Sequence, residues 1–403
     1  MDQRAFLASP ERLRDPYPFY RMLRENDPVL FVSGLFGLGA WVVTSHAVCE
    51  SVLRSKQFGK EGQRVLTPEQ MAHIPQENAE LAERRRANML FRDPPAHTRL
   101  RGLVNAAFTP RTVERLRPRI AEVASHLVDR AVEKKPFDLI RDFAFPLPII
   151  VIAELLGVPA EDRDRFKAWS TDLTLGLNPG ATPDELRAVK RAVEAIDGYM
   201  AGVIDERRRE ARADLISDLV RVQEQGDKLS MEELLATCRL LLTAGHETTV
   251  NLIGNGALAL LRNPDERAKL ADRALLPNAV EELLRFDSPV QMTMRFAFEA
   301  APLGRHQVKP GDLVVLLLAG ANRDPERFAE PERLDVRRPD ARGHVSFGAG
   351  IHYCIGAPLA RLEGEIAFDA LLSRLPGLSI ATPELTWRPN VVLRGLQSLP
   401  VNF

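Results

Sequence analysis

The run Phe347-Gly348-Ala349-Gly350-Ile351-His352-Tyr353-Cys354-Ile355-Gly356 carries the most structural information in this chain of 403 residues. Its three glycines predict a tight loop whose backbone wraps closely around the sulfur of Cys354. A helix-like run starts at Ala357, directly after the loop, so its unpaired N–H groups and the positive end of its dipole face the sulfur. These surroundings favour thiolate over thiol. A single thiolate with backbone donors aimed at it suits the axial ligand of a haem iron.

Two simpler interpretations of this loop are a structural cysteine and a zinc site. A buried cysteine in a glycine-rich turn would be preferred for a bare Cys-x-Gly. Zinc is disfavoured because no second cysteine or cluster of histidines supplies a tetrahedral set of ligands. The complete run resembles the haem-binding signature of the cytochrome P450 family, F-G-x-G-x-H-x-C-x-G, and matches every fixed position. The resemblance implies haem b with Cys354 as the ligand of its iron, held by a loop that includes Phe347, Gly348 and Gly356.

Composition and charge narrow the class of protein. The 54 basic and 55 acidic residues nearly cancel, so the field of the whole chain does not point to nucleic acid or a membrane surface. A hydrophobic content of 45% supports a large core, and no apolar run is long enough to cross a bilayer. Three scattered cysteines are too few for a disulfide framework, which indicates a reducing compartment. We therefore expect a cytoplasmic monomer that binds neither nucleic acid nor membrane.

The hydrophobic pattern predicts a mainly α fold with a smaller β-sheet portion (α+β). The clearest helix covers Met231–Arg262, because Ser230 and Glu233 form a capping box and Asn263-Pro264 ends the run. This helix would be about 48 Å long and would run through the core, since it is apolar on nearly every face. Further helices are predicted at 46–53, 110–132, 145–156, 162–175 and 182–212, and strands at 40–44, 295–297 and 313–317.

No repeat, low-complexity tract or linker divides the chain. The similarity to cytochromes P450 extends over almost all of it. The resemblance therefore implies a single domain over residues 1–403, with the P450 fold and its long central helix over the haem.

The segment Ala244-Gly245-His246-Glu247-Thr248-Thr249 is unusual for a helix interior. Gly245 costs about 1 kcal/mol relative to alanine, and the threonine hydroxyls can bond back to earlier carbonyls, so a local opening of the helix is expected. The alternative is a bend that serves packing, with Glu247 solvated or ion-paired. The segment is similar to the oxygen-activation motif of the family, which implies that Glu247 and Thr248 relay protons and that Ala244 lies against the haem. Its histidine is given no role.

Glu282 and Arg285 lie three residues apart on one predicted helix face, a spacing that is common for surface ion pairs. They resemble the E-x-x-R motif of cytochromes P450. The third member of that motif is matched by Arg333, although Leu334 stands where phenylalanine is common. The resemblance implies a buried, structural triad of Glu282, Arg285 and Arg333 that holds the haem loop in register.

Haem brings two propionates, which need cationic or hydrogen-bonding partners when they are partly buried. The segment Asp93-Pro94-Pro95-Ala96-His97-Thr98-Arg99-Leu100-Arg101 resembles the propionate-binding helix start of the family. His97 and Arg101 are four residues apart and share a helix face. Carried over by position, the resemblance implies His97, Arg101, Arg295 and His352 as the propionate partners. A solvated surface charge is the alternative for each arginine.

The resemblance implies a bacterial-type haem-thiolate monooxygenase that inserts one atom of O2 into an apolar small molecule by hydroxylation or epoxidation. The segment from Ala244 to Ile253 looks most like enzymes that oxidise polyketides, macrolides, steroids or fatty acids. An aliphatic lining with few polar anchors suits a medium or large apolar substrate. By position, the expected lining residues are Leu241, Ala244, Val290, Gln291, Met292, Val392 and Leu393.

The electrons are expected from outside, because the chain contains no flavin, iron–sulfur or G-x-G-x-x-G motif. A ferredoxin with its reductase would pass them on from NAD(P)H. Arg111, Arg115 and Arg361 are candidates for a basic docking face, with solvated arginines as the alternative. Two alternative functions remain. The first is a peroxide-driven oxygenase, but such relatives usually replace the adjacent acid and alcohol that Glu247 and Thr248 supply here. The second is a non-catalytic haem protein that binds or senses a ligand.

Overall fold

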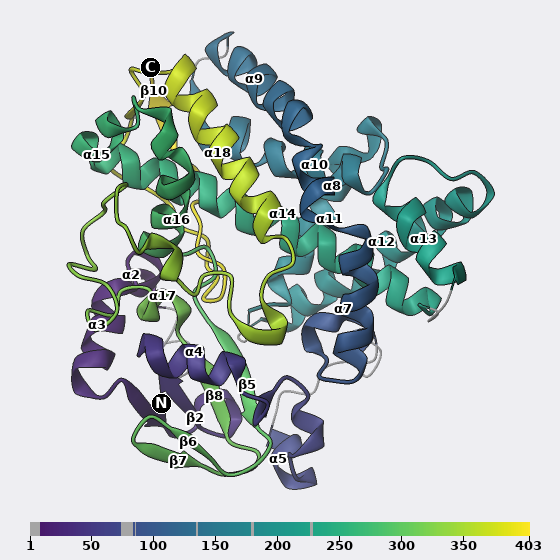
Figure 1. Cartoon of the computed structure of the whole chain (residues 1–403), viewed down its shortest axis with the longest axis vertical. Helices are drawn as coiled ribbons and strands as arrows, with labels where there is room; N and C mark the ends of the chain where they lie inside the picture. The colour runs from purple at the N-terminus through teal and green to yellow at the C-terminus, as the bar shows by residue number, and fades with distance from the viewer. Residues whose placement is uncertain (1–8, 74–83, 85, 134–135, 179–180, 226–228) are drawn as a thin grey trace.

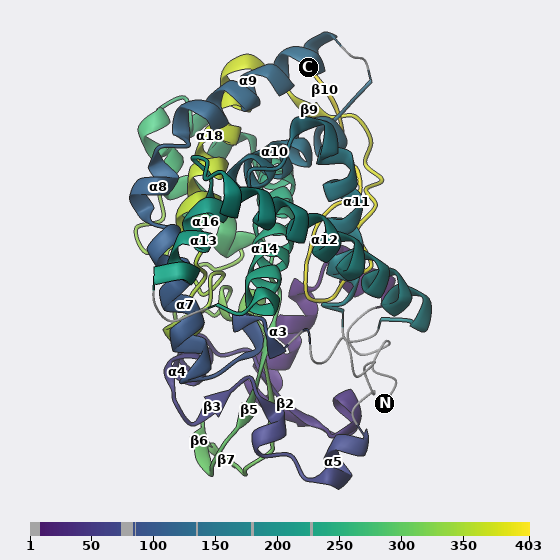
Figure 2. The same cartoon turned by 90° about the vertical axis from the view of Figure 1, so that its right-hand side faces the viewer.

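The computed structural model describes residues 9–73, 84, 86–133, 136–178, 181–225 and 229–403. Helices make up most of the molecule, and the largest sheet lies at one end, at the bottom of both views (Figures 1 and 2). The predicted mainly α fold with a smaller sheet is therefore confirmed. Within these residues no helix is both long and apolar enough to cross a membrane.

The main sheet has five strands in the order β1-β2-β8-β5-β3. β2 and β8 are parallel, and the other neighbours are antiparallel. The sheet joins strands from the first 60 residues to strands beyond residue 290. The bounds are β1 Val29–Val32, β2 Ala40–Val43, β3 Phe58–Gly59, β5 Thr293–Ala297 and β8 Leu313–Leu316. Smaller sheets contain β4 Phe137–Asp138, β6 Ala301–Leu303, β7 His306–Val308, β9 Ser379–Ile380 and β10 Pro400–Asn402.

The long helix α14 covers Met231–Arg262, as the sequence predicts. Ser230 Oγ accepts from the Glu233 backbone N–H, and the Glu233 carboxylate accepts from the Ser230 backbone N–H, so the predicted capping box is present. α14 is buried along most of its length and runs through the middle of the helical part, where it packs against α10, α11, α12, α16 and α18 (Figure 2).

The other helices follow the predicted pattern with one correction. Residues 110–132 form two helices, α8 and α9, and not one, because Pro118 has no N–H to bond the carbonyl of Glu114. The N-terminal helices are α2 Pro10–Arg14, α3 Tyr17–Asn26, α4 His46–Arg54, α5 Pro68–His73, α7 Ala96–Ala107, α8 Pro110–Glu114 and α9 Arg117–Glu133. The later ones are α10 Pro146–Leu155, α11 Arg163–Leu175, α12 Pro183–Arg209, α13 Leu215–Gln225, α15 Pro264–Lys269, α16 Leu276–Phe286, α17 Leu318–Ala321 and α18 Ala357–Arg374.

Candidate active site

The cysteine loop is as tight as its glycines predict. The Cys354 backbone N–H donates to the Phe347 carbonyl at 2.9 Å, which closes the loop. Gly348 and Gly350 have φ angles of +67° and +66°, the left-handed region that favours glycine. A Cβ on Gly350 would lie 2.3 Å from the Leu53 carbonyl oxygen, so the loop also needs glycine for its close approach to α4. Helix α18 begins directly afterwards, at Ala357, as predicted.

Buried polar groups anchor the start of this loop. The Asn322 amide donates to Ser288 Oγ at 2.8 Å and to Ser346 Oγ at 2.7 Å, and its oxygen accepts from the Val345 backbone N–H at 2.7 Å. All of these groups are buried. A buried network whose hydrogen bonds are all made rigidifies the segment that it joins. Contacts within the protein therefore hold the loop against α16 and α17.

Glu281 of α16 ties the loop to α18. Its carboxylate lies 3.0 Å from His344 Nε2 and 2.7 Å from Arg361 Nε. Burial acts to raise the pKa of Glu281, but the hydrogen bonds from His344 and Arg361 outweigh it and lower that pKa to about 2. Arg361 is therefore paired with Glu281, which makes it a weaker candidate for binding a redox partner than the sequence indicates.

The thiol of Cys354 sits where burial raises its pKa, while the backbone N–H of Gly356 and the charge of Arg101 act to lower it. The net direction is upward, so the expectation that the loop alone favours thiolate is wrong. The physical reason is that desolvation of the charged form outweighs the neighbouring donors. A metal ion bound to the sulfur removes this penalty, because a coordinating thiol is deprotonated outright.

Four basic residues meet beside the loop. His97 and Arg101 come from α7, Arg295 from β5, and His352 from the 3-10 turn at 350–352. The rings of His97 and His352 are 4.2 Å apart, and Arg101 and Arg295 are close enough to lower the pKa of His97, which burial already lowers, to about 4. The predicted propionate partners are thus brought together.

This cluster has unused donors. His97 is 2% exposed, and its Nδ1 has no hydrogen-bond partner among the described residues. The same holds for His352 Nε2, which lies 3.9 Å from Asp93 Oδ1. Buried polar atoms are almost always paired in native proteins. Unpaired donors beside a single accessible thiol fit a ligand that carries both a metal and carboxylates, and haem is such a ligand.

On α14, the accessible residues of the middle turns lie around Ala244. Ala244 is exposed, and Leu240 and Thr248, four positions to either side, are half-buried on a helix that is otherwise largely buried. Thr243 and Gly245 beside Ala244 are half-buried as well. Thr248 Oγ1 donates to the Ala244 carbonyl at 2.6 Å, which confirms the expected bond back to the preceding turn. The helix nevertheless continues without interruption through these residues, so the predicted local opening is absent.

Known proteins resemble this chain along its whole length. The Cytochrome P450 family model matches residues 178–378. The cytochrome P450 monooxygenase PikC of Streptomyces venezuelae is 45% identical over 396 residues, which cover 96% of this chain and 91% of PikC. The polyketide biosynthesis cytochrome P450 PksS of Bacillus subtilis (strain 168) is 42% identical over 96% of each chain. The chain belongs to the cytochrome P450 family.

A solved structure agrees with the sequences. P450BioI in complex with an acyl carrier protein bearing hexadec-9Z-enoic acid matches with a TM-score of 0.90 at 39% identity, covering 98% of this chain and 100% of that one. This cytochrome P450 is therefore a monooxygenase, and the identification based on the cysteine loop is confirmed. Family membership implies haem, which the unused donors and the accessible thiol fit.

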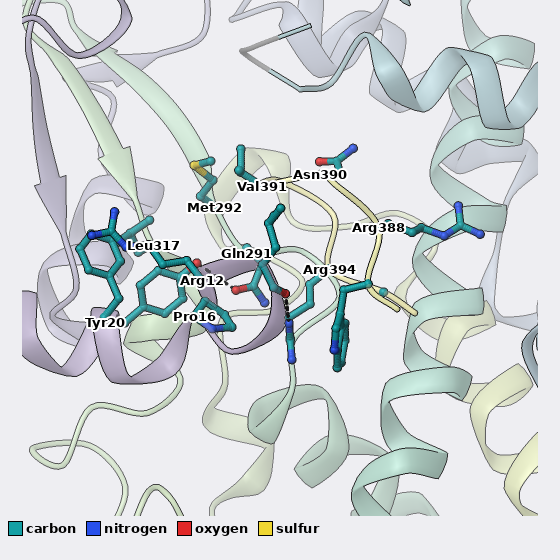
Figure 3. A pocket seen from close by; sticks show the side chains of 14 residues that line it. Arg12, Pro16, Tyr20, Gln291, Met292, Leu317, Arg388, Asn390, Val391 and Arg394 are labelled. Carbon is teal, nitrogen blue, oxygen red and sulfur yellow. Dashed lines mark hydrogen bonds between the residues drawn. The ribbon is translucent and has the colours of Figure 1, made fainter. Parts of the chain in front are cut away.

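The acid of the P450 motif is paired. Glu247 is 2% exposed and forms an ion pair with Arg388, which extends toward α14 from the C-terminal loop at 387–396 (Figure 3). Burial raises the pKa of Glu247, and Arg388 opposes that shift. The second carboxylate oxygen has no partner among the described residues. His246 is fully buried, with Nδ1 3.0 Å from Ser170 Oγ and no partner for Nε2 among the described residues.

The predicted substrate-lining residues separate into two groups. Val290 and Leu393 form an isolated bridge, and Val392 accepts from the Gln291 backbone N–H at 2.8 Å, so these segments are adjacent as expected. The Gln291 side chain, however, binds the Tyr20 hydroxyl at 3.0 Å and is 2% exposed. The Gln291 amide also donates to the Ser288 carbonyl at 2.7 Å, so it joins α3 to the segment before β5.

Met292 and Leu241 are likewise buried, at 3% and 6% exposure. Met292 lines a separate, small pocket between α2, α3 and the C-terminal loop (Figure 3). The lining includes none of the cysteine-loop residues. No sequence motif predicted this pocket, because its walls come from segments more than 250 residues apart. They include Arg12, Phe19, Tyr20, Gln291, Met292, Arg388, Asn390 and Arg394.

The structural triad has a different third member. Glu282 and Arg285 are fully buried and form a two-pronged pair at 2.7 and 2.9 Å. The arginine that joins them is Arg338, with Nε 3.1 Å from Glu282. Arg333 is wrong for this role, because its side chain is 58% exposed and pairs with Glu330. Only its backbone carbonyl faces the triad, where it accepts from Arg285 and Arg338.

Proposed function

We propose that this cytochrome P450 hydroxylates or epoxidises a medium or large apolar molecule of the polyketide, macrolide, steroid or fatty-acid kind. The observation that carries the proposal is the accessible stripe of Leu240, Ala244 and Thr248 on the otherwise buried α14. Aliphatic walls with few polar anchors favour an apolar ligand. The names of PksS and the P450BioI complex, which mention a polyketide and a fatty acyl chain, support the same class.

Each site residue has a part in this proposal. Cys354 would hold the iron, with Phe347, Gly348 and Gly356 shaping the loop and Ala244 lying against the ring. The haem, when bound, supplies the chemistry that activates O2. The chain moves the protons: Thr248 would turn its hydroxyl from the Ala244 carbonyl toward the reacting oxygen.

Glu247 would supply the proton that Thr248 passes on, and its partner Arg388 would hold it in place between turnovers. His97, Arg101, Arg295 and His352 would bind the haem propionates.

The test uses the haem-loaded protein. A panel of macrolactones, steroids and long-chain fatty acids is titrated while the spin-state shift of the haem is followed, and ligands that respond are tested for a product with one added oxygen atom. We expect at least one class to do both. In Cys354→Ser, the red-shifted Soret band of the ferrous–CO form should be lost. Retention of that band, or a protein that binds the panel and oxidises none of it, would contradict the proposal.

We also propose that a ferredoxin, reduced from NAD(P)H by its reductase, delivers electrons at the cysteine face, a name used here for Arg54, Arg342, Ile351 and Tyr353. The side chains of Arg54 and Arg342 are 63% and 76% exposed, and Ile351 and Tyr353 are 47% and 39% exposed. A basic rim with apolar contacts suits an acidic partner. The described cysteines are all free, which supports a cytoplasmic location.

A further inference from the structure

Lys60 is a cation that no motif singled out, and it lies beside the basic cluster. It directly follows β3, which pairs antiparallel with β5 so that Gly59 lies opposite Phe296. Continuing this register by one residue places Lys60 opposite Arg295. Like charges directly opposite one another destabilise a pair of strands. The arrangement therefore needs a compensating anion.

The two cations share one neutral acceptor. Lys60 Nζ donates to Thr293 Oγ1 at 2.9 Å, and Arg295 Nη1 donates to the same oxygen at 3.2 Å. The nearby carboxylate of Asp93 is already occupied, because its Oδ2 accepts the backbone N–H groups of Lys60 and Glu61, both at 2.8 Å. Burial, reinforced by Arg295, lowers the pKa of Lys60 well below its ordinary value. Among the residues that the structure describes, the Lys60 ammonium has the Thr293 hydroxyl as its partner and no carboxylate at hydrogen-bond distance.

The surroundings show where an anion would bind. Two cations, Lys60 and Arg295, lie beside the Asp93 carboxylate, and the neighbouring carboxylate of Glu61 is already paired with Arg92. The unused Nδ1 of His97 belongs to the same cluster, on a side chain that is 2% exposed. An excess of positive charge together with an unused buried donor favours an acidic ligand.

We propose that Lys60 and Arg295 together bind a carboxylate inside the haem site. A haem propionate is the source that the cluster favours, because the unused Nδ1 of His97 belongs to the same cluster. The carboxylate of an acidic substrate has the same chemistry. The inference rests on haem binding, which family membership implies, and it adds to the propionate partners a residue that sequence reasoning missed. No signal in the sequence could have found Lys60, since its neighbours depend on the pairing of β3 with β5.

The first experiment measures haem loss from the holoenzyme to excess apomyoglobin. Lys60→Met should lose haem roughly 10- to 100-fold faster than the original protein, as expected for one charge-assisted bond. Lys60→Arg should restore the slow rate, and Lys56→Met, which removes an exposed lysine of the same segment, should change nothing. The ferrous–CO spectrum of each variant checks that thiolate-bound haem is present. A negative result for Lys60 can therefore be told apart from a failure of the proposed function.

Two further measurements identify which molecule supplies the carboxylate. With haem dimethyl ester, which lacks free propionates, Lys60→Met and the original protein should lose the cofactor equally fast if the propionate is the ligand. If a substrate carboxylate is the ligand, Lys60→Met should instead weaken the binding of hexadecanoic acid and leave that of its methyl ester unchanged.

Removing one of two facing cations should also raise the stability of the haem-free protein to urea, the opposite of its effect on the holoenzyme. This opposite sign separates carboxylate binding from a merely structural role. The proposal is overturned if Lys60→Met folds, loses haem at the original rate and still distinguishes the acid from its ester as the original protein does.

Discussion

Glu247 and Thr248 are neighbours on α14 but differ in environment. Glu247 is buried against Arg388, whereas Thr248 faces the accessible stripe with its hydroxyl bonded to the Ala244 carbonyl. A proton relay needs both an acid and a hydroxyl that can reorient, and these two side chains supply one each. Their separate partners allow the acid and the alcohol to be tested independently.

Thr248→Ala should separate NADH consumption from product formation. Loss of the hydroxyl leaves substrate binding and reduction intact, so the ratio of product to NADH used should fall while hydrogen peroxide release rises. Thr243→Ala is a matched control, because Thr243 makes the same bond to a carbonyl one turn earlier on α14, that of Arg239 at 2.9 Å. Equal ratios in Thr248→Ala and the original enzyme would assign Thr248 to helix packing alone.

Arg388→Gln tests the partner of the acid. Burial raises the pKa of Glu247 and Arg388 opposes that shift, so removing Arg388 should raise the pKa further. Arg388 is the charged side chain that acts on Glu247. The pH profile of the product-to-NADH ratio should therefore move to higher pH. In a Glu247→Gln background, Arg388→Gln should cause no such movement; an equal movement there would show that Arg388 acts through another group.

Among the elements, α16 and the long loop that follows α17 are joined by Glu282, Arg285 and Arg338. Arg338→Met should destabilise the protein by about 3–5 kcal/mol, because it leaves buried charge on Glu282 less compensated. Arg333→Met is the control, since its side chain is largely exposed and it should cost less than about 1 kcal/mol. Urea unfolding of the holoenzymes gives both values. If both variants lose the same free energy of unfolding, Arg333 contributes to the triad as much as Arg338 does.

The contact of α14 with α18 contains a buried acid. Burial raises the pKa of Glu363 to about 8, although a hydrogen bond with Thr249 acts to lower it. Above an unfolded pKa of about 4.3, the folded state keeps a proton that the unfolded state has lost. The free energy of unfolding should therefore fall by up to about 1.4 kcal/mol per pH unit until the pH passes the folded value.

Glu363→Gln cannot titrate, so its stability relative to the original protein should rise between about pH 5 and pH 8. Urea midpoints of both proteins at several pH values measure the difference. A difference that stays constant across this range would mean that Glu363 is ionised in the folded protein.

For the molecule as a whole, electron supply is the property to test. NADH alone should support no turnover, and adding a ferredoxin with its reductase should restore it. Raising the ionic strength should weaken this activity, because exposed charges guide the encounter. Arg342→Glu on the cysteine face should raise the KM for ferredoxin severalfold, whereas Arg187→Glu, exposed on α12, should not. Sustained turnover by the isolated chain with NADH would contradict the proposed partner.

Much of this architecture follows from the sequence because its causes are local. The limits of α14 depend on Ser230, Glu233 and Pro264, which act within one helical turn. The cysteine loop depends on glycines that alone accept its backbone angles and its approach to α4. The resemblance of that loop to a known signature then supplied the family, and the basic residues carried over by position do meet in space.

Tertiary structure alone decided the rest, because those contacts depend on how distant segments pack. Arg333 and Arg338 are both arginines at plausible spacing, and only the path of the loop brings Arg338 to Glu282. The Gln291 side chain accepts a hydrogen bond from Tyr20, which is 271 residues away. Lys60 meets Arg295 only through the register of β3 on β5, and burial outweighs the local donors at Cys354. Local hydrogen bonding fixes elements, whereas long-range pairing and desolvation decide which side chains face one another and what charge they carry.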